Sequence, residues 1–309
     1  MLNSRKGGWK ILKDKLFYIK AHELTHDSAT KNKSNNIGNG TTNPLYCEDN
    51  KYFTCVPNIF IQEKLKKDFG LNRIFISTYI EIDRRRSREG IVYLTIDYIL
   101  KKCGYRLTRN KPKIFYEVIK SLLFLKENNF IDCDFDPYSV NYNDCIRIKI
   151  IKENFDCKES FTKVYHKDVD YIMTAETYLN RENILVVFLY IISYIGCRKN
   201  NDGAIPSNNP EAFWKSINNM ASDLSMSKAT ISQCLDFLTT TPSNSQNALL
   251  IKHEVGSIKQ GDKPPQNVAN IYVLNKEGYE NEIIWALQKM KDIYNVEEFN
   301  KPTKIKKEN

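Results

Sequence analysis

Residues 218–238 read NNMASDLSMSKATISQCLDFL, and their spacing predicts a helix-turn-helix. Ala221 is a small residue suited to the point where two helices meet, Ser225 follows four positions later at the turn, and Ile231 follows ten positions later as a packing residue. In DNA-binding proteins the second helix of such a motif lies in the major groove. Glycine would be more usual than Ser225 at the turn, which weakens the match. The positions that would face the groove are Ser227, Lys228, Ala229, Ser232 and Gln233.

The segments around this motif extend it to a winged helix-turn-helix domain at residues 170–295. A long apolar helix precedes the motif, a hairpin follows it, and Ser227 can cap the motif's second helix. The expected elements are helices at 182–196, 213–224 and 227–238, strands at 249–253 and 271–274, and a last helix at 279–294. The last helix has apolar residues at helical spacing, so it either packs back on this domain or pairs with a partner chain. Residues 296–309 form a basic tail.

The same order of elements is expected earlier in the chain, in a first winged-helix domain at residues 51–155. Thr95 can cap a helix that ends at Gly104, because the position after a helix commonly needs a positive φ. Pro112 fits the first turn of the next helix. The expected elements are helices at 71–83, 95–103 and 112–126 and strands at 91–94, 130–134 and 145–151.

Periodicity also predicts which side chains of this first domain face solvent. In the strand at 145–151, Arg147 and Lys149 alternate with isoleucines and therefore point outward. The outward positions of the helix at 112–126 are Lys113, Tyr116, Glu117 and Lys120. The chain is therefore expected to be mainly α with small β hairpins (α+β), with two winged helix-turn-helix domains in tandem.

Length and composition exclude several classes of protein. A chain of 309 residues is about twice a typical domain length, and 41% hydrophobic residues suffice for a core. The longest apolar run, ILVVFLYIISYI at 184–195, is shorter than the ~20 residues of a bilayer span. The N-terminus has no signal-peptide pattern. A cytoplasmic protein without membrane contact is expected.

Residues 1–50 are expected to form a basic arm and a disordered linker. Within the arm, Trp9, Leu12, Leu16 and Ile19 fall at helical spacing and suggest an amphipathic helix. Residues 25–45, THDSATKNKSNNIGNGTTNPL, have almost nothing to bury.

One motif in the arm indicates a different chemistry. Residues 22–26 spell HELTH, and HExxH on a helix lets two histidines bind zinc while the glutamate acts as general base. The stretch AHELTH resembles the active-site helix of thermolysin-like metalloproteases. Only 21 residues precede it, too few for the sheet on which such sites rest. We expect a chance match and no metal site, with a zinc metallopeptidase as an alternative.

Other signs of enzymatic chemistry are lacking in the sequence. It contains no GxxxxGK[ST] phosphate loop and no His-hydrophobic-His pair of the kind used by rolling-circle nicking enzymes. The eight cysteines lack the spacing of a zinc ribbon or a thioredoxin-like pair, so buried reduced thiols are expected. We expect no catalytic residue and no cofactor.

The net charge of +9 is unevenly distributed. Residues 95–126 contain eight basic and two acidic residues, a net of +6, whereas residues 211–241 contain two basic and three acidic residues, a net of −1. Cations neutralise DNA phosphates, so the first domain is the better DNA surface. A solvated basic face, or a winged helix that contacts only protein, is the alternative. The residues expected to contact DNA are Lys101, Lys102, Arg106, Arg109, Lys111, Lys113, Tyr116, Lys120, Arg147 and Lys149 in the first domain and Ser227, Lys228, Ser232 and Gln233 in the second.

Four segments together suggest a family. They read YFTCVPNIF from Tyr52, LNRIFISTYIEIDRRR from Leu71, LTIDYILKKCGY from Leu94 and KIFYEVIKSLLFLKENNFI from Lys113. Together they resemble the amino-terminal winged helix of plasmid replication initiators from Gram-positive bacteria, and related tandem units occur in phage replisome organisers and DnaD-like primosome proteins. The sequence departs from that pattern in the extra residues at 106–111. The resemblance implies sequence-specific binding of double-stranded DNA at repeated origin sites and recruitment of host replication proteins.

The same elements also fit another class of DNA-binding protein. A winged-helix transcriptional regulator would bind DNA in the same way and would differ by an effector pocket or an operator. The second domain has a near-neutral recognition segment and two apolar helices, so it is suited to meeting another chain, and a homodimer is the expected assembly.

Overall fold

The computed structural model describes residues 52–65, 70–106, 111–151, 161–195, 210–239, 248–259 and 264–300. The chain divides into a unit of residues 1–43 and a compact unit of residues 44–309, and every described residue belongs to the second unit. The arm and linker expected at 1–50, including HELTH, lie outside the described residues. So do residues 301–309 of the basic tail and Arg109.

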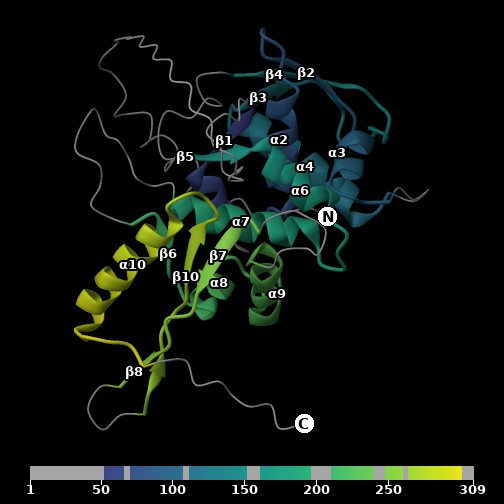
Figure 1. The fold of residues 1–309 in the computed structure, drawn as a ribbon. Helices are drawn as coiled ribbons and strands as arrows, with labels where there is room; N and C mark the ends of the chain where they lie inside the picture. The colour runs from purple at the N-terminus through teal and green to yellow at the C-terminus, as the bar shows by residue number, and fades with distance from the viewer. Residues whose placement is uncertain are drawn as a thin grey trace, which may run out of the picture. The chain divides into compact units, whose positions relative to one another are not determined.

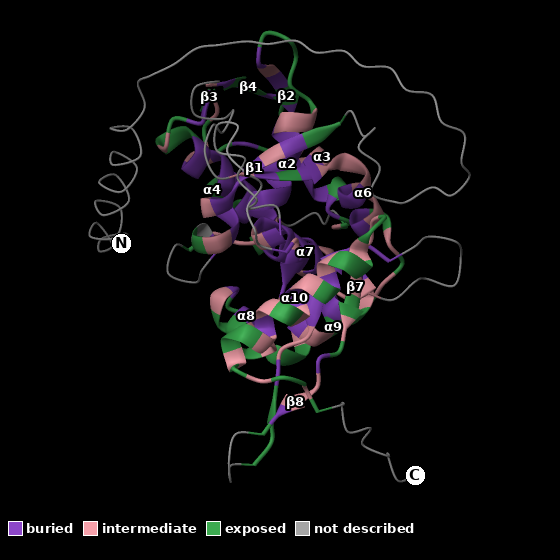
Figure 2. Cartoon of the chain, turned by 60° about the vertical axis from the view of Figure 1, so that its left-hand side comes forward, coloured by how far each residue is buried: buried purple, intermediate pink, exposed green. Residues whose placement is uncertain are grey.

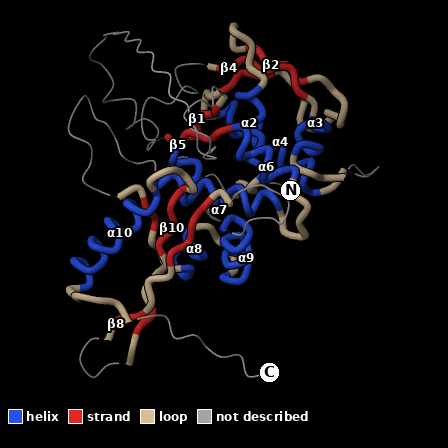
Figure 3. The backbone as a smooth tube through the Cα atoms, in the orientation of Figure 1, coloured by secondary structure: helices blue, strands red, loops and turns tan. Residues whose placement is uncertain are grey.

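Helices and small antiparallel sheets make up this unit, which confirms the expected α+β class (Figure 3). In its first half, helix α2 (Ile74–Arg84) is followed by strand β2 (Ile91–Leu94), helices α3 (Ile96–Lys102) and α4 (Lys113–Glu127), and strands β3 (Ile131–Cys133) and β4 (Ile146–Ile150) (Figure 1). The strands lie in the order β2-β4-β3, so β2 pairs with the second strand of the hairpin. The elements expected here are confirmed, β2 with the expected bounds and the others with ends shifted by one to three residues.

Local signals account for the ends of these helices. The Thr95 hydroxyl accepts a hydrogen bond from the Tyr98 amide at 3.1 Å, as expected of an N-cap. Gly104 has a φ of +77° directly after α3. Two details differ from expectation. Pro112 is the N-cap of α4 and not its first helical residue, and Glu117 is buried, because the buried arc of α4 is wider than its apolar stripe.

The second half repeats this order. Helix α7 (Arg181–Ile195) is followed by strand β6 (Ala212–Phe213), helices α8 (Ile217–Asp223) and α9 (Lys228–Thr239), and strands β7 (Leu250–His253) and β10 (Ile271–Leu274). The strand order is β6-β10-β7, which is again first strand, last strand, middle strand. The expectation of a helix from Phe213 was wrong. Phe213 lies in β6, paired with Tyr272, and the Ser216 hydroxyl caps a helix that begins at Ile217.

The second hairpin is longer than the first and supports the last helix. Strands β8 (Ser257–Ile258) and β9 (Gln266–Asn267) extend it. Helix α10 (Tyr279–Tyr294), with the expected bounds, packs against this half through Ile283, Ala286 and Met290. Of the two arrangements expected for α10, the structure has the one that packs on its own domain.

Besides β6, β8 and β9, four elements have no counterpart in the sequence analysis. Strand β1 (Phe53–Pro57) pairs with β5 (Phe161–Tyr165), a π-helical turn spans Phe60–Lys64, and helix α6 (His166–Thr174) follows β5. The pairing joins segments more than a hundred residues apart, and both strands are short. Local pattern therefore did not reveal them.

Helix α7 is the centre of the unit. Twelve of its fifteen residues are buried, and Figure 2 shows it buried between the elements of the two halves. It packs against α2, α6 and β5 of the first half and against α9, β6 and β10 of the second. The halves therefore share one core helix.

Arg73, the residue before α2, joins the first half to the turn between α8 and α9. Its guanidinium donates hydrogen bonds to the carbonyl oxygens of Leu224 and Ser225, both at 3.2 Å. Ser225 has a φ of +51°, and the amide of Met226 donates to the carbonyl of Ala221 at 3.0 Å. This is the left-handed helix ending that glycine usually supplies, so the turn has the geometry that its sequence only weakly indicated.

We predict that Ser225→Gly stabilises the protein. A side chain at positive φ costs free energy, and glycine removes that cost while adding some unfolded-chain entropy. The expected gain in the free energy of unfolding is about 0.5 to 1 kcal/mol, measured by denaturant unfolding. Gly104→Ala is the matched opposite case, because a β-carbon there would lie 2.2 Å from an Arg181 guanidinium nitrogen. A destabilised Ser225→Gly variant would contradict the prediction.

A buried carboxyl lies where α7 meets the end of α3. Glu182 accepts a hydrogen bond from the Tyr105 hydroxyl at 2.9 Å. Burial raises the pKa of Glu182 to about 7, although Tyr105 and the positive charge of Arg73 act in the opposite direction. Burial also raises the pKa of Asp168 in α6 to about 7. Both groups are more easily protonated in the folded chain than in the unfolded chain.

We predict that Glu182→Gln removes a pH-dependent loss of stability. With a folded pKa above the ordinary value, the contribution of Glu182 is fully present below about pH 4.5 and is lost as pH rises through about 7. The variant should therefore gain on the wild type across this window, reaching about 1 to 3 kcal/mol at pH 8. Unfolding free energies of both proteins between pH 5 and 8 test this, and Asp168→Asn should add a gain of the same sign. A difference that does not change with pH would refute it.

Candidate nucleic-acid interface

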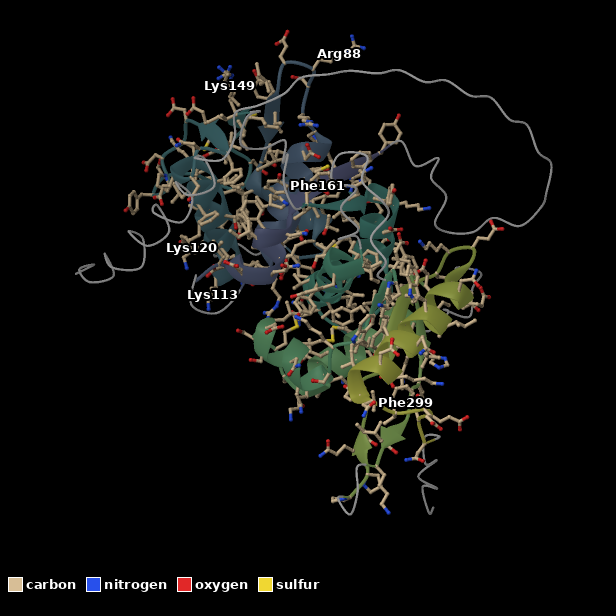
Figure 4. The ribbon with its side chains drawn as sticks, turned by 90° about the vertical axis from the view of Figure 1, so that its left-hand side faces the viewer. Arg88, Lys113, Lys120, Lys149, Phe161 and Phe299 are labelled. Carbon is tan, nitrogen blue, oxygen red and sulfur yellow. The ribbon has the colours of Figure 1, made fainter. Side chains whose placement is uncertain are left out.

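The exposed face of α4 carries three of the residues expected to contact DNA. Lys113, Tyr116 and Lys120 follow one another at spacings of three and four, so they share one side of the helix. Figure 4 shows Lys113 and Lys120 along one side of the molecule. The ring of Phe115, on the buried side of α4, packs edge-to-face with the ring of Tyr116, and the two ring centres are 5.4 Å apart.

The two lysines of this face differ in their electrostatic surroundings. Lys113 has no ion pair among the described residues. Lys120 donates to the carboxylate of Glu117 at 3.1 Å, and Glu117 is buried. Part of the charge of Lys120 is therefore offset by Glu117 of the same helix. The positive charge of this face is smaller than the number of its lysines suggests.

Lys111 has a role in the fold that its sequence did not indicate. It is half-buried, its ammonium group donates to the Val140 carbonyl at 2.7 Å, and it lies 5.0 Å from the centre of the Phe115 ring. The amide of Asp97 donates to the Tyr142 carbonyl at 2.9 Å. The loop between β3 and β4 is thus held against the starts of α3 and α4.

This loop also makes the tip of the first hairpin acidic. Residues 134–145 contain Asp134, Asp136 and Asp144, all exposed, and no basic residue. The basic residues expected on this wing are confined to β4, where Arg147 and Lys149 are exposed as the alternation predicted. A phosphate backbone approaching this sheet would meet cations on β4 and carboxylates at the tip.

The cations of α3 and of the loop before β2 are mostly engaged. Lys101 pairs with Asp97 at 2.8 Å, while Lys102 and Arg106 are exposed. In the run RRRSR at 84–88, the first three arginines have partners. These contacts are Arg84 to both carboxylate oxygens of Asp170 at 2.8 and 2.7 Å, Arg85 over the ring of Tyr98 at 3.6 Å, and Arg86 to Asp83 at 3.1 Å. Arg88 is exposed and has no such contact among the described residues.

Helices α8 and α9 present fewer charges. Ser227 caps α9 as expected, because its hydroxyl accepts a hydrogen bond from the Thr230 amide at 3.0 Å. Lys228 and Gln233 are exposed, and Ser232 is half-buried. Because Ser227 serves as a cap, the groups of this helix available to a ligand are chiefly Lys228 and Gln233.

A separate polar cluster fixes the position of α8. The ammonium group of Lys215 lies within hydrogen-bond distance of the Tyr190 hydroxyl at 3.0 Å, the Tyr194 hydroxyl at 2.8 Å and Asp223 at 3.3 Å. Tyr190 also donates to Asp223. The cluster connects α7 to both ends of α8, so we interpret it as structural.

The described residues provide no group of three histidines, cysteines or carboxylates that could hold a metal ion. Within those same ranges, no helix is long and apolar enough to cross a membrane. Of the cysteines described there, Cys103, Cys133 and Cys234 are buried as expected, but Cys145 is exposed. Burial raises the pKa of the Cys133 thiol to about 11 and that of Cys234 to about 12, so both stay protonated near neutral pH.

No protein-family model matches the sequence, and no curated protein matches it.

Two exposed residues of this half were absent from the sequence-based set. Tyr93 on β2 is 59% exposed, and Arg88 lies in the loop that precedes the same strand. Strand alternation in IVYL, with Val92 and Leu94 inward, would have placed Tyr93 outside. For Arg88 the sequence held no signal, because only the tertiary contacts distinguish it from its neighbours.

We predict that the α4 face contributes more to DNA affinity than the α9 face does. Lys113→Gln with Lys120→Gln removes two charges but keeps an amide for Glu117, and it should weaken duplex binding about tenfold at low salt. Lys228→Gln with Gln233→Ala, the matched change on α9, should cost about twofold or less. Titration of one labelled duplex with each full-length variant decides this, and a larger loss from the α9 pair would reverse the assignment.

Proposed function

We propose that this protein binds duplex DNA through two winged helix-turn-helix domains in tandem. The observation that carries the proposal is the repeated topology. Each half runs helix, strand, helix, helix, hairpin, and each sheet places its first strand beside the last strand of the hairpin. That is the arrangement of a winged helix-turn-helix, in which the third helix reads the major groove.

Charge and exposure support a division of work between the two domains. The third helix of the first domain, α4, exposes Lys113, Tyr116 and Lys120, and its surroundings add Lys102, Arg106 and the cations of β4. The third helix of the second domain, α9, exposes Lys228 as its basic residue. We assign DNA contact mainly to the first domain and assign assembly, as a homodimer or with host replication proteins, to the second.

The biological role that we propose is initiation of plasmid or phage replication in the cytoplasm. Its support is the sequence resemblance to plasmid replication initiators together with the paired topology. An initiator that binds repeated sites benefits from pairing, because a bound neighbour raises the effective concentration at the next repeat. A transcriptional regulator would use the same helices but would bind a single operator.

Selection of bound sequences from a pool of random duplexes, with the full-length protein, tests sequence specificity. Footprinting on DNA that surrounds the gene, followed by a plasmid maintenance assay, then separates the two roles. Binding at several direct repeats whose loss abolishes maintenance supports an initiator. One protected site at a promoter, without effect on maintenance, supports a regulator.

We predict that duplex affinity falls steeply with salt. Each neutralised phosphate releases counterions, so the dissociation constant should rise by an order of magnitude or more between about 50 and 200 mM salt. The Lys113→Gln, Lys120→Gln variant should have a shallower slope, by about 1 to 2 in the plot of log affinity against log salt. Fluorescence anisotropy over this salt range provides the measurement. A flat response of the wild type would contradict binding to the phosphate backbone.

A further inference from the structure

The outer face of the β2-β4-β3 sheet presents an aromatic ring beside unpaired cations. Tyr93 on β2 lies directly opposite Arg147 on β4, and Lys149 follows two residues later on the same face. All three are exposed. Residues directly opposite in an antiparallel pair have β-carbons about 5 Å apart, so the ring of Tyr93 and the side chain of Arg147 are neighbours.

The core of the protein does not require the exposed side chains of this sheet face. The inner side of the same strands buries Val92 and Leu94 of β2 and Ile146, Ile148 and Ile150 of β4, which satisfies the core. Their backbones pair within the sheet, but among the described residues the side chains of Tyr93, Arg147 and Lys149 have no hydrogen bond, ion pair or ring contact. The side chain of Arg88, in the loop before β2, likewise makes no such contact among the described residues. Figure 4 shows Arg88 and Lys149 at the same end of the molecule.

Other cations near this sheet do have partners. Arg84, Arg85 and Arg86 each have a carboxylate or an aromatic partner within 3.6 Å. The arginines just before β2 are thus paired with a carboxylate or stacked on a ring. The side chains of Arg147 and Lys149 on the sheet face make no such contact among the described residues. On β2 the exposed residue opposite Arg147 is Tyr93, and on β3 the exposed Asp132 lies opposite Lys149, so Arg147 has the more open charge of the two.

We propose that this sheet face binds an unpaired DNA strand. Cations supply attraction for the phosphates, and an aromatic ring beside them offers a stacking surface for a base. A base in a duplex is already stacked on both sides, so a ring standing on a sheet cannot reach its face. The occupant that uses Tyr93 as well as Arg147 and Lys149 is therefore single-stranded. The acidic loop at 134–145 bounds the site, because phosphates avoid it.

This inference goes beyond the duplex contact of α4 and does not require it. If both hold, one domain would grip duplex DNA by α4 and hold an adjoining separated strand by its sheet. The cations of β4 serve both contacts, but Tyr93 serves only the separated strand, so Tyr93→Ala removes the second activity alone.

The test uses the full-length protein and a labelled oligothymidylate of about 12 nucleotides, within the usual site size of such surfaces. We expect Tyr93→Ala to weaken single-strand binding about five- to tenfold, and Tyr93→Phe, which keeps the ring, to change it less than twofold. Arg147→Gln with Lys149→Gln should also weaken it. The matched control is Tyr138→Ala, because Tyr138 is 91% exposed in the adjacent acidic loop. Tyr93→Thr removes the ring while keeping strand propensity, should thermal melting show that the alanine variant is unfolded.

Duplex binding measured in parallel separates this inference from the proposed function. Unchanged duplex affinity in Tyr93→Ala, with lost single-strand affinity, supports the inference. Failure of the wild type to bind the oligothymidylate overturns it and leaves duplex binding intact. Equal losses from Tyr93→Ala and Tyr138→Ala, or equal losses for duplex and single strand, also overturn it. A protein partner on this face would leave single-strand affinity insensitive to Tyr93, which is again an overturning result.

Discussion

The burial of one helix against both halves of the unit is the constraint on which the rest of the structure depends. Helix α7 is apolar on nearly every side, so it cannot be a surface helix of one domain. Elements of the first half cover one side, and α9, β6 and β10 cover the other. The two halves are therefore not independent units joined by a linker. They form one core, and their relative position is set by α7 and by Arg73.

That shared core explains why polar groups are buried where the halves meet. Arg73 satisfies the carbonyls at the end of α8, and Glu182 is held by Tyr105 at the end of α3. The first contact links the start of α2 to the end of α8, and the second links α7 to the residues after α3.

The two hairpins have the same topology but different forms. In the first, Lys111 and Asp97 hold the loop at 134–145 back against α3 and α4, and the loop is acidic. In the second, β8 and β9 prolong the hairpin, and Ser257 is bonded to Asn300 after α10. The two halves thus differ in the parts that lie outside the core. The cationic surface accordingly belongs to α4 and β4 and not to a basic wing tip.

Local sequence was sufficient wherever a single helix or strand carried its own signals. The cap at Thr95, the left-handed Gly104 and the alternation in β4 follow from side-chain chemistry within a few residues, and the structure has all three. Partners distant in sequence decided the rest. The pairing of β1 with β5, the strand at Phe213 and the burial of Glu117 depend on which surfaces meet. For the candidate site, sequence identified the lysines of α4 and the cations of β4. Only the tertiary structure decided which cations are open, because an ion pair such as Arg84 with Asp170 joins residues that no local pattern connects.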